Sequence, residues 1–457
     1  MPQACVIGLG RSGIAAARVL NRDGWNVTLF EQADNQALRQ LGAPLTQEGI
    51  TLKLGHRLNP DQDGWPQQLV VSPGVPWDLP LLVEARARGI EVMGELELAW
   101  RSLKSVPWVG ITGTNGKTTT TSLVQAIFQK AGLNAPACGN IGYAACELVL
   151  QNQSYDWIIA EISSYQIESS ATLAPQIGLW TTFTPDHLSR HKTLENYYAI
   201  KASLLSRSEI QVLNSDDPHL YRHAPALYPD AYWTSTQGQE HLLCDPKQGV
   251  YLQDNWINAF GELIAPINLF KMPGRHNQQN LLMAIAAARL AEIDKKAITE
   301  TLLTFTGVPH RLEPICTVEG IQFINDRKAT NYDAAEVGLS SMQKPTILIA
   351  GGEAKEGDDQ AWLAQIQAKA VKVLLIGEAA TAFGDRLQSV GYNEYEIVKT
   401  MDNAVQRGFE LAQAIGAGCV LLSPACASFD QYQSFEERGD DFRSCCLALS
   451  SRQGQQG

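Results

Sequence analysis

The sequence is short of the features that mark secreted, zinc-binding, nucleic-acid-binding and membrane proteins. Its nine cysteines include no C-x-x-C pair, which argues against a zinc knuckle, and their odd number argues against a disulfide framework. Acidic residues outnumber basic ones and the net charge is −12, so no nucleic-acid partner is expected. No apolar run approaches the ~20 residues of a membrane span. Arg11 interrupts the first apolar stretch and no basic segment precedes it, so no signal peptide is expected. We therefore expect a reduced cytoplasmic protein.

What the sequence does contain is enough apolar material for several hydrophobic cores. Hydrophobic residues make up 45% of the 457 residues and charged residues 18%, as in ordinary globular proteins. This length predicts about three domains of ~150 residues each. Strand and helix patterns alternate through the first, central and last parts of the chain, which indicates an α/β protein.

Residues 110–119 (GITGTNGKTT) form the motif around which the chain is organised. They follow an apolar run, so the pattern predicts a buried strand, a glycine-rich turn and a helix that begins near Lys117. Backbone N–H groups in such a turn converge on one point, where the helix N-terminus adds partial positive charge. Lys117 is suited to neutralise nucleotide phosphates, and the Thr118 hydroxyl to ligate Mg²⁺. Ile111 replaces the first glycine of the strict phosphate-loop pattern, and an ordinary strand-to-helix turn is the alternative. The placement of the other residues favours a nucleotide site.

A second glycine-rich turn lies in residues 8–13 (GLGRSG), between a short apolar strand and an Ala-rich helix. The next strand ends at Glu31, an arrangement typical of dinucleotide-binding domains in which the acid holds a ribose. The pattern is weak by itself. NAD is one candidate ligand, any diphosphate is another, and the glycines can also serve only tight strand–helix packing. A further strand at 69–71 leads into Ser72 and Gly74 at what should be the same edge of the sheet.

Two polar residues follow predicted strands of the central part. Glu161 comes at the end of the apolar strand 157–160, and ligands of open α/β sheets bind beyond the carboxyl ends of the strands. Glu161 is therefore placed to face a nucleotide's metal, although an acid there can also cap the next turn. His187 follows the strand 177–183 and, taken alone, is typical of a surface-loop histidine.

One predicted helical face contains a lysine among apolar residues. The members of this stripe are Leu194, Tyr197, Tyr198, Lys201, Leu204 and Leu205. Lys201 can extend out of the stripe along its own stem. The alternative is a desolvated amine with a lowered pKa, which reacts with CO₂ to give a carbamate, an oxygen ligand suited to Mg²⁺.

The remainder of the chain predicts a β-rich insertion at 231–270 and a further α/β domain. Asn277 either caps the helix that follows the insertion or contacts the nucleotide, and residues 306–311 have the character of a hinge. The strands expected beyond the hinge are 321–324, 346–350, 371–376 and 419–422. Polar loops follow these strands and two of them carry Lys328 and Lys355, which predicts a site for an anionic small molecule.

Together these features resemble the Mur ligase family, the ATP-dependent amide-forming enzymes of peptidoglycan precursor synthesis. The resemblance covers essentially the whole chain. It rests on residues 113–119, Glu161, His187, Lys201, Asn277 and the pair 310–311. Residues 325–331 (NDRKATN) and 422–432 (LSPACASFDQY) are similar to the member of the family that adds D-glutamate.

The resemblance implies an α/β fold of three domains. A Rossmann-like N-terminal domain (1–97) binds a UDP-sugar and not NAD. A central P-loop ATPase-like mononucleotide-binding domain with a β insertion (98–306) binds ATP. A Rossmann-like C-terminal domain (307–457) binds the amino acid. The first domain is expected to end near Glu97, before a linker at 100–105, and a monomer is expected.

The resemblance also assigns roles to individual residues. The implied catalytic and metal-holding residues are Lys117, Thr118, Glu161, His187 and Lys201. Those implied to contact ATP are Gly113, Thr114, Asn115, Gly116, Lys117, Thr118, Thr119, Asn277, Arg311 and Asp326. Those implied to bind UDP-N-acetylmuramoyl-L-alanine or D-glutamate are Gly10, Ser12, Glu31, Ser72, Gly74, Asn140, Ser163, Gln166, Lys328, Thr330, Lys355, Ser428, Phe429 and Phe435. The chain departs from the family's usual residues at Arg327, Ala354 and Glu356.

The implied chemistry is a two-step acyl transfer. The L-alanyl carboxylate attacks the γ-phosphate of ATP to give an acyl phosphate, and the amine of D-glutamate then displaces phosphate. Lys117 and two Mg²⁺ ions, one of them held by His187 and carbamylated Lys201, would offset the repulsion between the reacting anions. The third domain should close to exclude water. Two other classes stay open: an NAD-dependent dehydrogenase with an ATP-binding regulatory unit, which rests on residues 8–31 alone, and a non-catalytic nucleotide switch.

Overall fold

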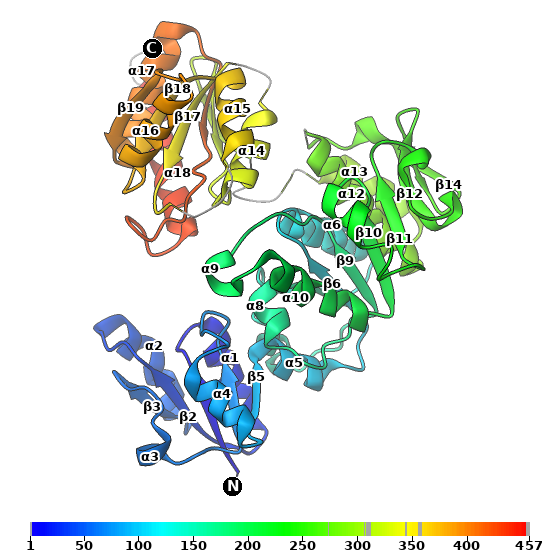
Figure 1. Ribbon diagram of the computed structural model, residues 1–457, viewed down its shortest axis with the longest axis vertical. Helices are drawn as coiled ribbons and strands as arrows, with labels where there is room; N and C mark the ends of the chain where they lie inside the picture. The colour runs from blue at the N-terminus through cyan, green and yellow to red at the C-terminus, as the bar shows by residue number, and fades with distance from the viewer. Residues whose placement is uncertain are drawn as a thin grey trace. The chain divides into compact units, whose positions relative to one another are not determined.

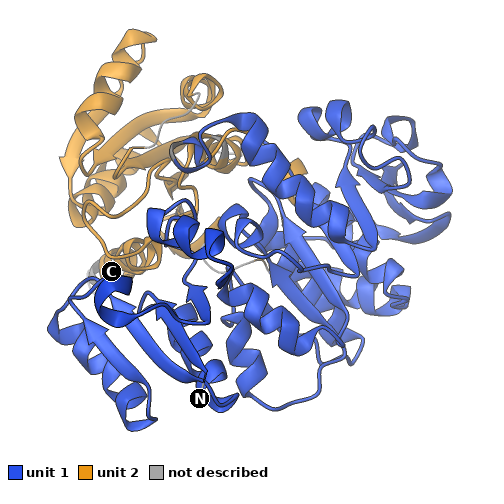
Figure 2. Ribbon diagram, turned by 60° about the horizontal axis from the view of Figure 1, so that its bottom comes forward, with its two compact units in different colours: residues 1–183, 187–271, 278–305 blue, residues 184–186, 272–277, 306–457 orange. Residues whose placement is uncertain are grey.

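The computed structural model describes residues 2–272, 274–305, 307, 312–342, 345–354 and 359–453. They form three α/β domains, built on separate sheets of five, nine and six strands (Figure 1). The chain divides into two compact units (Figure 2). One unit contains residues 1–183, 187–271 and 278–305, and the other contains 184–186, 272–277 and 306–457. The expected α/β fold of three domains is confirmed.

Five parallel strands form the sheet of the first domain, in the order β3-β2-β1-β4-β5. The strands are β1 (Gln3–Ile7), β2 (Asn26–Glu31), β3 (Thr51–Leu54), β4 (Gln68–Val71) and β5 (Glu91–Gly94). The helices are α1 (Arg11–Arg22), α2 (Gln36–Gln47), α3 (Pro60–Asp63), α4 (Pro80–Ala87) and α5 (Glu95–Leu103). Successive side chains of a strand point to opposite faces. Val6 of β1 accordingly packs in the core that contains α1, and Cys5 in the core that contains α4.

Helix α5 corrects the expectation of a linker at 100–105, because residues 100–103 are its last turn. The helix forms because Leu96, Leu98 and Ala99 are buried in the core. Its two buried carboxylates bond to the central domain: Glu95 accepts from the backbone N–H of Cys146, and Glu97 from that of Thr172. Burial raises the pKa of Glu95 to about 7.

The central sheet has nine strands in the order β14-β13-β12-β11-β10-β9-β6-β8-β7. The strands are β6 (Trp108–Thr112), β7 (Ala137–Gly139), β8 (Ile158–Glu161), β9 (Ile177–Trp180), β10 (Ile210–Asn214), β11 (Tyr232–Ser235), β12 (Gly249–Gln253), β13 (Trp256–Ala259) and β14 (Glu262–Pro266). The helices are α6 (Lys117–Lys130), α7 (Ala145–Leu150), α8 (Ser164–Glu168), α9 (Leu188–His191), α10 (Leu194–Arg207), α11 (Pro218–His223), α12 (Arg275–Leu290) and α13 (Lys295–Thr304). Strand β6 lies between β8 and β9 and is buried along its whole length, which is why it is a continuous apolar run.

The β-rich stretch expected at 231–270 is present and continues the central sheet. Strands β11 and β12 extend its parallel part, and β13 and β14 then reverse direction to make an antiparallel edge. Between β11 and β12 the chain forms two short 3-10 helices, η1 (Gln239–His241) and η2 (Pro246–Gln248). A third, η3 (Ile267–Leu269), follows β14.

Six strands form the sheet of the third domain, in the order β15-β16-β20-β17-β18-β19, and β15 runs antiparallel to β16. The strands are β15 (Glu313–Val318), β16 (Ile321–Asn325), β17 (Thr346–Gly351), β18 (Ala370–Ile376), β19 (Tyr395–Lys399) and β20 (Cys419–Leu422). The helices are α14 (Tyr332–Ser340), α15 (Gln360–Lys369), α16 (Ala380–Ser389), α17 (Met401–Ile415) and α18 (Phe435–Gln453). Leu348 of β17 packs with α14 to α16, and Ile349 packs with α17 and α18, so both faces of the sheet are covered.

The third sheet brings together the loops that sequence analysis singled out. Strands β16, β20 and β17 are adjacent and parallel, so their carboxyl ends lie at one edge of the sheet. None of the helices in the described part of the chain combines the length and the apolar character needed to cross a bilayer.

Candidate active site

The phosphate loop, residues 113–116, joins the carboxyl end of β6 to the first turn of α6. Gly113 and Gly116 have φ angles of +152° and +82°, which favour glycine. Space also requires it: a Cβ on Gly113 would lie 2.0 Å from Oγ1 of Thr181. Ile111 replaces the first glycine of the strict pattern and is fully buried in β6. The sharp turn begins two residues later, at Gly113. The structure therefore contains the predicted strand, turn and helix.

Two lysines converge on the carbonyl oxygens of this loop. Lys117 Nζ donates to the carbonyl oxygens of Gly113 and Thr114, at 2.8 and 2.7 Å. Lys201 Nζ donates to the carbonyl of Gly113 at 2.9 Å and lies 3.3 Å from the Thr112 hydroxyl. The Lys201 side chain is 1% exposed, so it does not extend into solvent along its stem. The predicted helical stripe therefore contains a buried amine, and the fold places this amine beside the phosphate loop.

Glu161, the last residue of β8, is a buried carboxylate on the strand next to β6. Its Oε1 accepts a hydrogen bond from Asn140 Nδ2 at 2.8 Å, while its buried Oε2 has no hydrogen-bond partner among the described residues. A buried carboxylate oxygen without a partner is costly unless a ligand satisfies it. Glu161 and the Thr118 hydroxyl, in the first turn of α6, therefore offer oxygen donors, which is what Mg²⁺ prefers.

The described residues contain no cluster of three or more His, Cys, Asp and Glu side chains that could hold a metal alone. Mg²⁺ is bound in proteins through one or two carboxylates together with substrate phosphates. His187 is the N-cap of α9 with φ +56°, and its ring lies 5.1 Å from that of Tyr165, centroid to centroid.

Ser163 and Gln166 form the capping box of α8. The backbone N–H and the hydroxyl of Ser163 both donate to Oε1 of Gln166 at 3.0 Å, and the backbone N–H of Gln166 donates to the Ser163 hydroxyl at 3.3 Å. These two residues fix the start of the helix that follows Glu161.

The glycine turn of the first domain is closed by its own polar side chains. Glu31 Oε2 accepts from the backbone N–H of Leu9 at 2.9 Å, and the Ser72 hydroxyl donates to the carbonyl of Gly8 at 3.2 Å. Gly13 is required by packing, since a Cβ there would lie 1.9 Å from the carbonyl oxygen of Gly8.

Gly10 differs from Gly13 because a Cβ on it would meet no atom within 4 Å, and the same holds for Gly74. The φ of Gly10 is −89°, a value open to any residue. Neither the backbone conformation at Gly10 nor its packing requires glycine. The close approach of a ligand is a remaining reason for glycine at this position. Ser12, in the first turn of α1, is half-buried.

The loops after β16 and β20 in the third domain hold the remaining predicted residues. Asp326 is buried and accepts from the Ser423 hydroxyl at 3.0 Å. Lys328 Nζ lies 5.7 Å from the centre of the Phe435 ring, and the backbone N–H of Thr330 donates to the Lys328 carbonyl at 2.8 Å. The structure therefore brings the two loops together around Asp326.

Ser428 and Phe429 differ sharply in environment although they are neighbours in the β20 loop. The Ser428 hydroxyl is buried and has no hydrogen-bond partner among the described residues, so it is available to a ligand. The Phe429 side chain is 68% exposed.

Arg327, where the family usually has serine, is accommodated against helix α18. Its side chain is buried, and it donates to the carbonyl of Glu436 and to Asp440 Oδ1. Gly439 makes the room, because a Cβ there would lie 1.8 Å from Arg327 Cδ. Arg327 thus joins the β16 loop to α18. Ala354 is exposed.

Three sequence-predicted positions, Arg311, Lys355 and Glu356, lie outside the described residues. Asn277 is the third residue of α12 and is buried, so it is not the N-cap of that helix. This removes the plain helix-cap interpretation and leaves a contact to a ligand as the prediction.

Sequence reasoning missed the residues that brace the phosphate loop from β9 and α10. Thr182 Oγ1 accepts from the backbone N–H of Asn115 at 2.9 Å, and Thr181 Oγ1 donates to the carbonyl of the same residue at 2.5 Å. The Tyr197 hydroxyl lies 3.2 Å from the Thr114 hydroxyl. The sequence contains one signal for this contact, the pair of threonines that follows β9. Interpreting that signal requires knowing that β9 lies next to β6 in the sheet.

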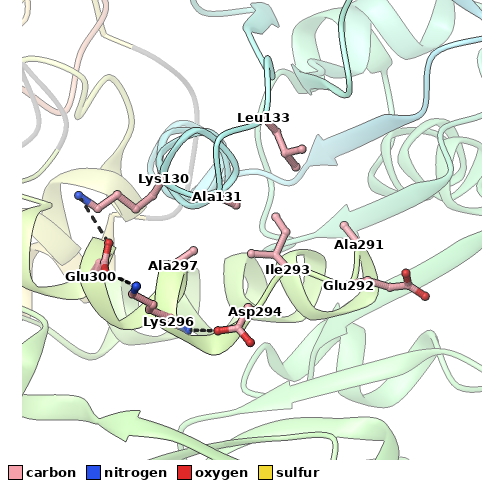
Figure 3. Close-up of a pocket in the computed structure, with 10 residues that line it drawn as sticks. All are labelled: Lys130, Ala131, Leu133, Ala291, Glu292, Ile293, Asp294, Lys296, Ala297 and Glu300. Atoms are coloured by element: carbon pink, nitrogen blue, oxygen red, sulfur yellow. Dashed lines mark hydrogen bonds and ion pairs between the residues drawn. The ribbon is translucent and has the colours of Figure 1, made fainter.

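A surface cavity of about 500 Å³ lies far from this loop, at the opposite end of α6 (Figure 3). Lys130 and Glu300 form an ion pair at one edge of it, with 3.9 Å between Nζ and Oε2. Helix α6 has 14 residues, and at ~1.5 Å per residue the cavity is about 20 Å from the phosphate loop. The cavity is therefore not the nucleotide site.

The three sheets and the phosphate loop define a multidomain nucleotide-binding α/β protein. Family models match three segments: "Mur ligase MurD-like, N-terminal domain" at residues 2–94, "Mur ligase middle domain" at 111–288 and "Mur ligase, glutamate ligase domain" at 310–426. The chain belongs to the Mur ligase family.

Individual relatives are similar to this chain over nearly its full length, in agreement with its membership of the family. The chain is 82% identical over 451 residues to the UDP-N-acetylmuramoylalanine–D-glutamate ligase of Synechocystis sp., covering 98% of this chain and 100% of that one. The enzyme of the same name from Gloeothece citriformis is 67% identical over 449 residues, with 98% and 100% covered. Among solved structures, the UDP-N-acetylmuramate-alanine ligase of Thermotoga maritima has a TM-score of 0.60 at 18% identity, with 98% and 100% covered. That likeness supports the fold.

Proposed function

We propose that this protein is an ATP-dependent ligase that joins D-glutamate to UDP-N-acetylmuramoyl-L-alanine in peptidoglycan precursor synthesis. The observation that carries the proposal is the convergence of Lys117 and Lys201 on the phosphate loop, in a chain 82% identical to a ligase of that name. Two cations at a loop of this kind suit a reaction that must bring two anions together.

In the first step the L-alanyl carboxylate attacks the γ-phosphate of ATP, which gives an acyl phosphate and ADP. The phosphates bind at the backbone N–H groups of residues 113–116 and at the N-terminus of α6. Binding turns Lys117 from the loop carbonyls toward the β- and γ-phosphates, where its charge offsets the repulsion between the two reactants. Asn277, Asp326 and Arg311 contact the nucleotide.

Side chains of the central domain would hold Mg²⁺. Thr118 and Glu161 would hold one ion, and Oε2 of Glu161, which has no hydrogen-bond partner among the described residues, supports this assignment. The His187 ring and a carbamate on Lys201 would hold a second. The metal supplies charge that stabilises the transferring phosphoryl group. The burial of the Lys201 amine beside the phosphate loop supports this position for the carbamate.

In the second step the amine of D-glutamate attacks the acyl carbon, and phosphate leaves through a tetrahedral intermediate. The carboxylates of D-glutamate bind to the side chains of Lys328, Thr330 and Ser428, with Lys355, Phe429 and Phe435 completing the site. The Ser428 hydroxyl, which has no hydrogen-bond partner in the described part of the chain, supports this role.

The UDP-sugar binds to the first domain, at the turn that contains Gly10 and Ser12. Their place at the N-terminus of α1 suits a diphosphate, and the open space at Gly10 supports the approach of a ligand. Glu31, Ser72 and Gly74 shape the same edge, and Asn140, Ser163 and Gln166 contact the distal part of the substrate.

The proposal is tested by measuring ADP release with each substrate omitted in turn. We expect release only when ATP, UDP-N-acetylmuramoyl-L-alanine and D-glutamate are all present, and no release with L-glutamate. Turnover that depends on NAD, or ATP binding without turnover, would replace the proposal by a dehydrogenase or a nucleotide switch.

A further inference from the structure

Arg438 is a buried cation that none of the steps above uses. It lies in the first turns of α18, and its side chain is 1% exposed. Burial lowers its pKa to about 10, so the guanidinium stays charged at neutral pH. A positive charge near a helix N-terminus is also unfavourable toward the helix dipole. The fold therefore keeps a costly group at this point.

The guanidinium of Arg438 bonds to backbone carbonyls of two different loops. Nη2 donates to the carbonyl of Arg327 at 3.2 Å and to that of Cys426 at 3.0 Å. Nη1 donates to the carbonyl of Ala427 at 3.0 Å. Arg327 belongs to the loop after β16, and the other two belong to the loop after β20. One side chain thus ties together two loops that have no sequence continuity.

A third loop packs against the same guanidinium. A Cβ on Gly352, just after β17, would lie 3.1 Å from Arg438 Nη1 and 2.3 Å from the carbonyl oxygen of Ala427. Glu353 and Ala427 also pair through reciprocal backbone hydrogen bonds of 3.0 Å. Strands β16, β20 and β17 are neighbours in the sheet, so Arg438 lies where their carboxyl-end loops meet.

The carbonyls that Arg438 holds directly precede the residues assigned to the amino acid. Arg327 precedes Lys328, and Ala427 precedes Ser428. We propose that Arg438 is a positioning residue of the amino-acid site, which fixes the distance between Lys328 and Ser428 so that together they bind the two carboxylates of a dicarboxylic amino acid. This inference rests on the function proposed above.

A planar fork of donors is needed for this role, because it must reach carbonyls on two loops at once. A lysine at this position keeps the positive charge but carries all its donors on one nitrogen. A glutamine keeps neither the charge nor the planar set of guanidinium donors. Arg443 provides a matched control on the same helix: it pairs with Glu313 of β15 and contacts none of the three loops through the bonds described.

The test is steady-state kinetics on the full chain and its R438Q, R438K and R443Q variants, with KM measured for each substrate. We expect R438Q to raise KM for D-glutamate by about tenfold or more, since hydrogen bonds to charged groups are lost. KM for ATP and for UDP-N-acetylmuramoyl-L-alanine should stay within about twofold. R438K should show an intermediate rise, and R443Q the wild-type value.

Unchanged KM for D-glutamate in both Arg438 variants would overturn the inference, and so would an equal rise in KM for all substrates. If R438Q does not unfold cooperatively, R438K decides by the same criterion. A wild-type enzyme without ADP release dependent on D-glutamate would overturn the proposed function and this inference together. Wild-type activity with unaffected Arg438 variants would overturn this inference alone.

Discussion

Lys201 and Gly113 are joined by a hydrogen bond of 2.9 Å between an amine and a carbonyl oxygen 88 residues apart in the chain. The amine comes from the buried face of α10 and the carbonyl from the phosphate loop. This bond ties the lysine of an apolar stripe to the place where phosphates bind. In the proposed mechanism, this location would allow a carbamate on Lys201 to bind a metal beside the nucleotide phosphates.

We predict that Lys201→Ala leaves the enzyme nearly inactive and that short carboxylic acids restore part of the activity by taking the place of the carbamate. Wild-type enzyme supplied with carbon-13 bicarbonate should show a carbamate resonance in the NMR spectrum, and Lys201→Ala should lack it. Full activity of Lys201→Ala, or an unmodified amine in metal-bound enzyme at neutral pH, would refute the carbamate.

Lys117→Ala should lower turnover by about a hundredfold or more, because charge is removed from the transferring phosphate. The fold should persist, since the hydrogen bonds from Lys117 to the two loop carbonyls contribute only about 1 kcal/mol each. Initial rates and thermal unfolding measure the two effects. Lys130→Ala, at the exposed far end of the same helix, is the control and should match wild type. Loss of cooperative unfolding in Lys117→Ala would mean that the lysine is structural.

Gly10→Val should raise KM for the UDP-substrate with little effect on KM for ATP. A Cβ at this position would have no atom of the described residues within 4 Å, so we expect the substitution to act on a ligand rather than on packing. Gly13→Val is the contrasting variant, because its Cβ would lie 1.9 Å from the Gly8 carbonyl oxygen and should destabilise the fold. Equal losses for both substrates in Gly10→Val would show that the first domain is not a separate substrate site.

Glu95 should make the protein less stable as pH rises from about 5 to 8. Burial raises the pKa of this carboxyl to about 7, above its value in the unfolded chain, so the folded state binds the proton more tightly. Stability is then lost as pH rises toward the folded pKa. Between these pH values, the free energy of unfolding of Glu95→Gln should rise relative to that of wild type by on the order of 2 kcal/mol, as measured by urea unfolding. Exposed Glu84→Gln is the control, and an equal pH dependence in wild type and Glu95→Gln would contradict the argument.

Much of the fold and the phosphate site could be predicted from sequence because the signals are local. The turn at Gly113 and Gly116 needs positive φ angles, and the stripe around Lys201 follows helical spacing. The role of Arg438 could not be predicted. It stands among Glu436, Glu437, Asp440 and Asp441, a pattern typical of a solvated helix face, and only the three loops packed over it make it buried.

The prediction of a linker at 100–105 was wrong for a related reason. The polar residues Arg101, Ser102 and Lys104 obscure the last turn of α5 in the sequence, because that turn lies beyond the buried part of the helix, residues 95–99. The bracing of Asn115 by Thr181 and Thr182 likewise depends on strand order, which no local pattern contains.

The central claim is that the carboxylate of one substrate is activated as an acyl phosphate before the amine attacks. The most direct measurement uses UDP-N-acetylmuramoyl-L-alanine with oxygen-18 in its carboxylate, together with ATP, Mg²⁺ and D-glutamate. Mass spectrometry of the products should find one labelled oxygen in each inorganic phosphate released and one in each new amide. Unlabelled phosphate formed together with ADP would show that ATP is hydrolysed by water, and would contradict the account.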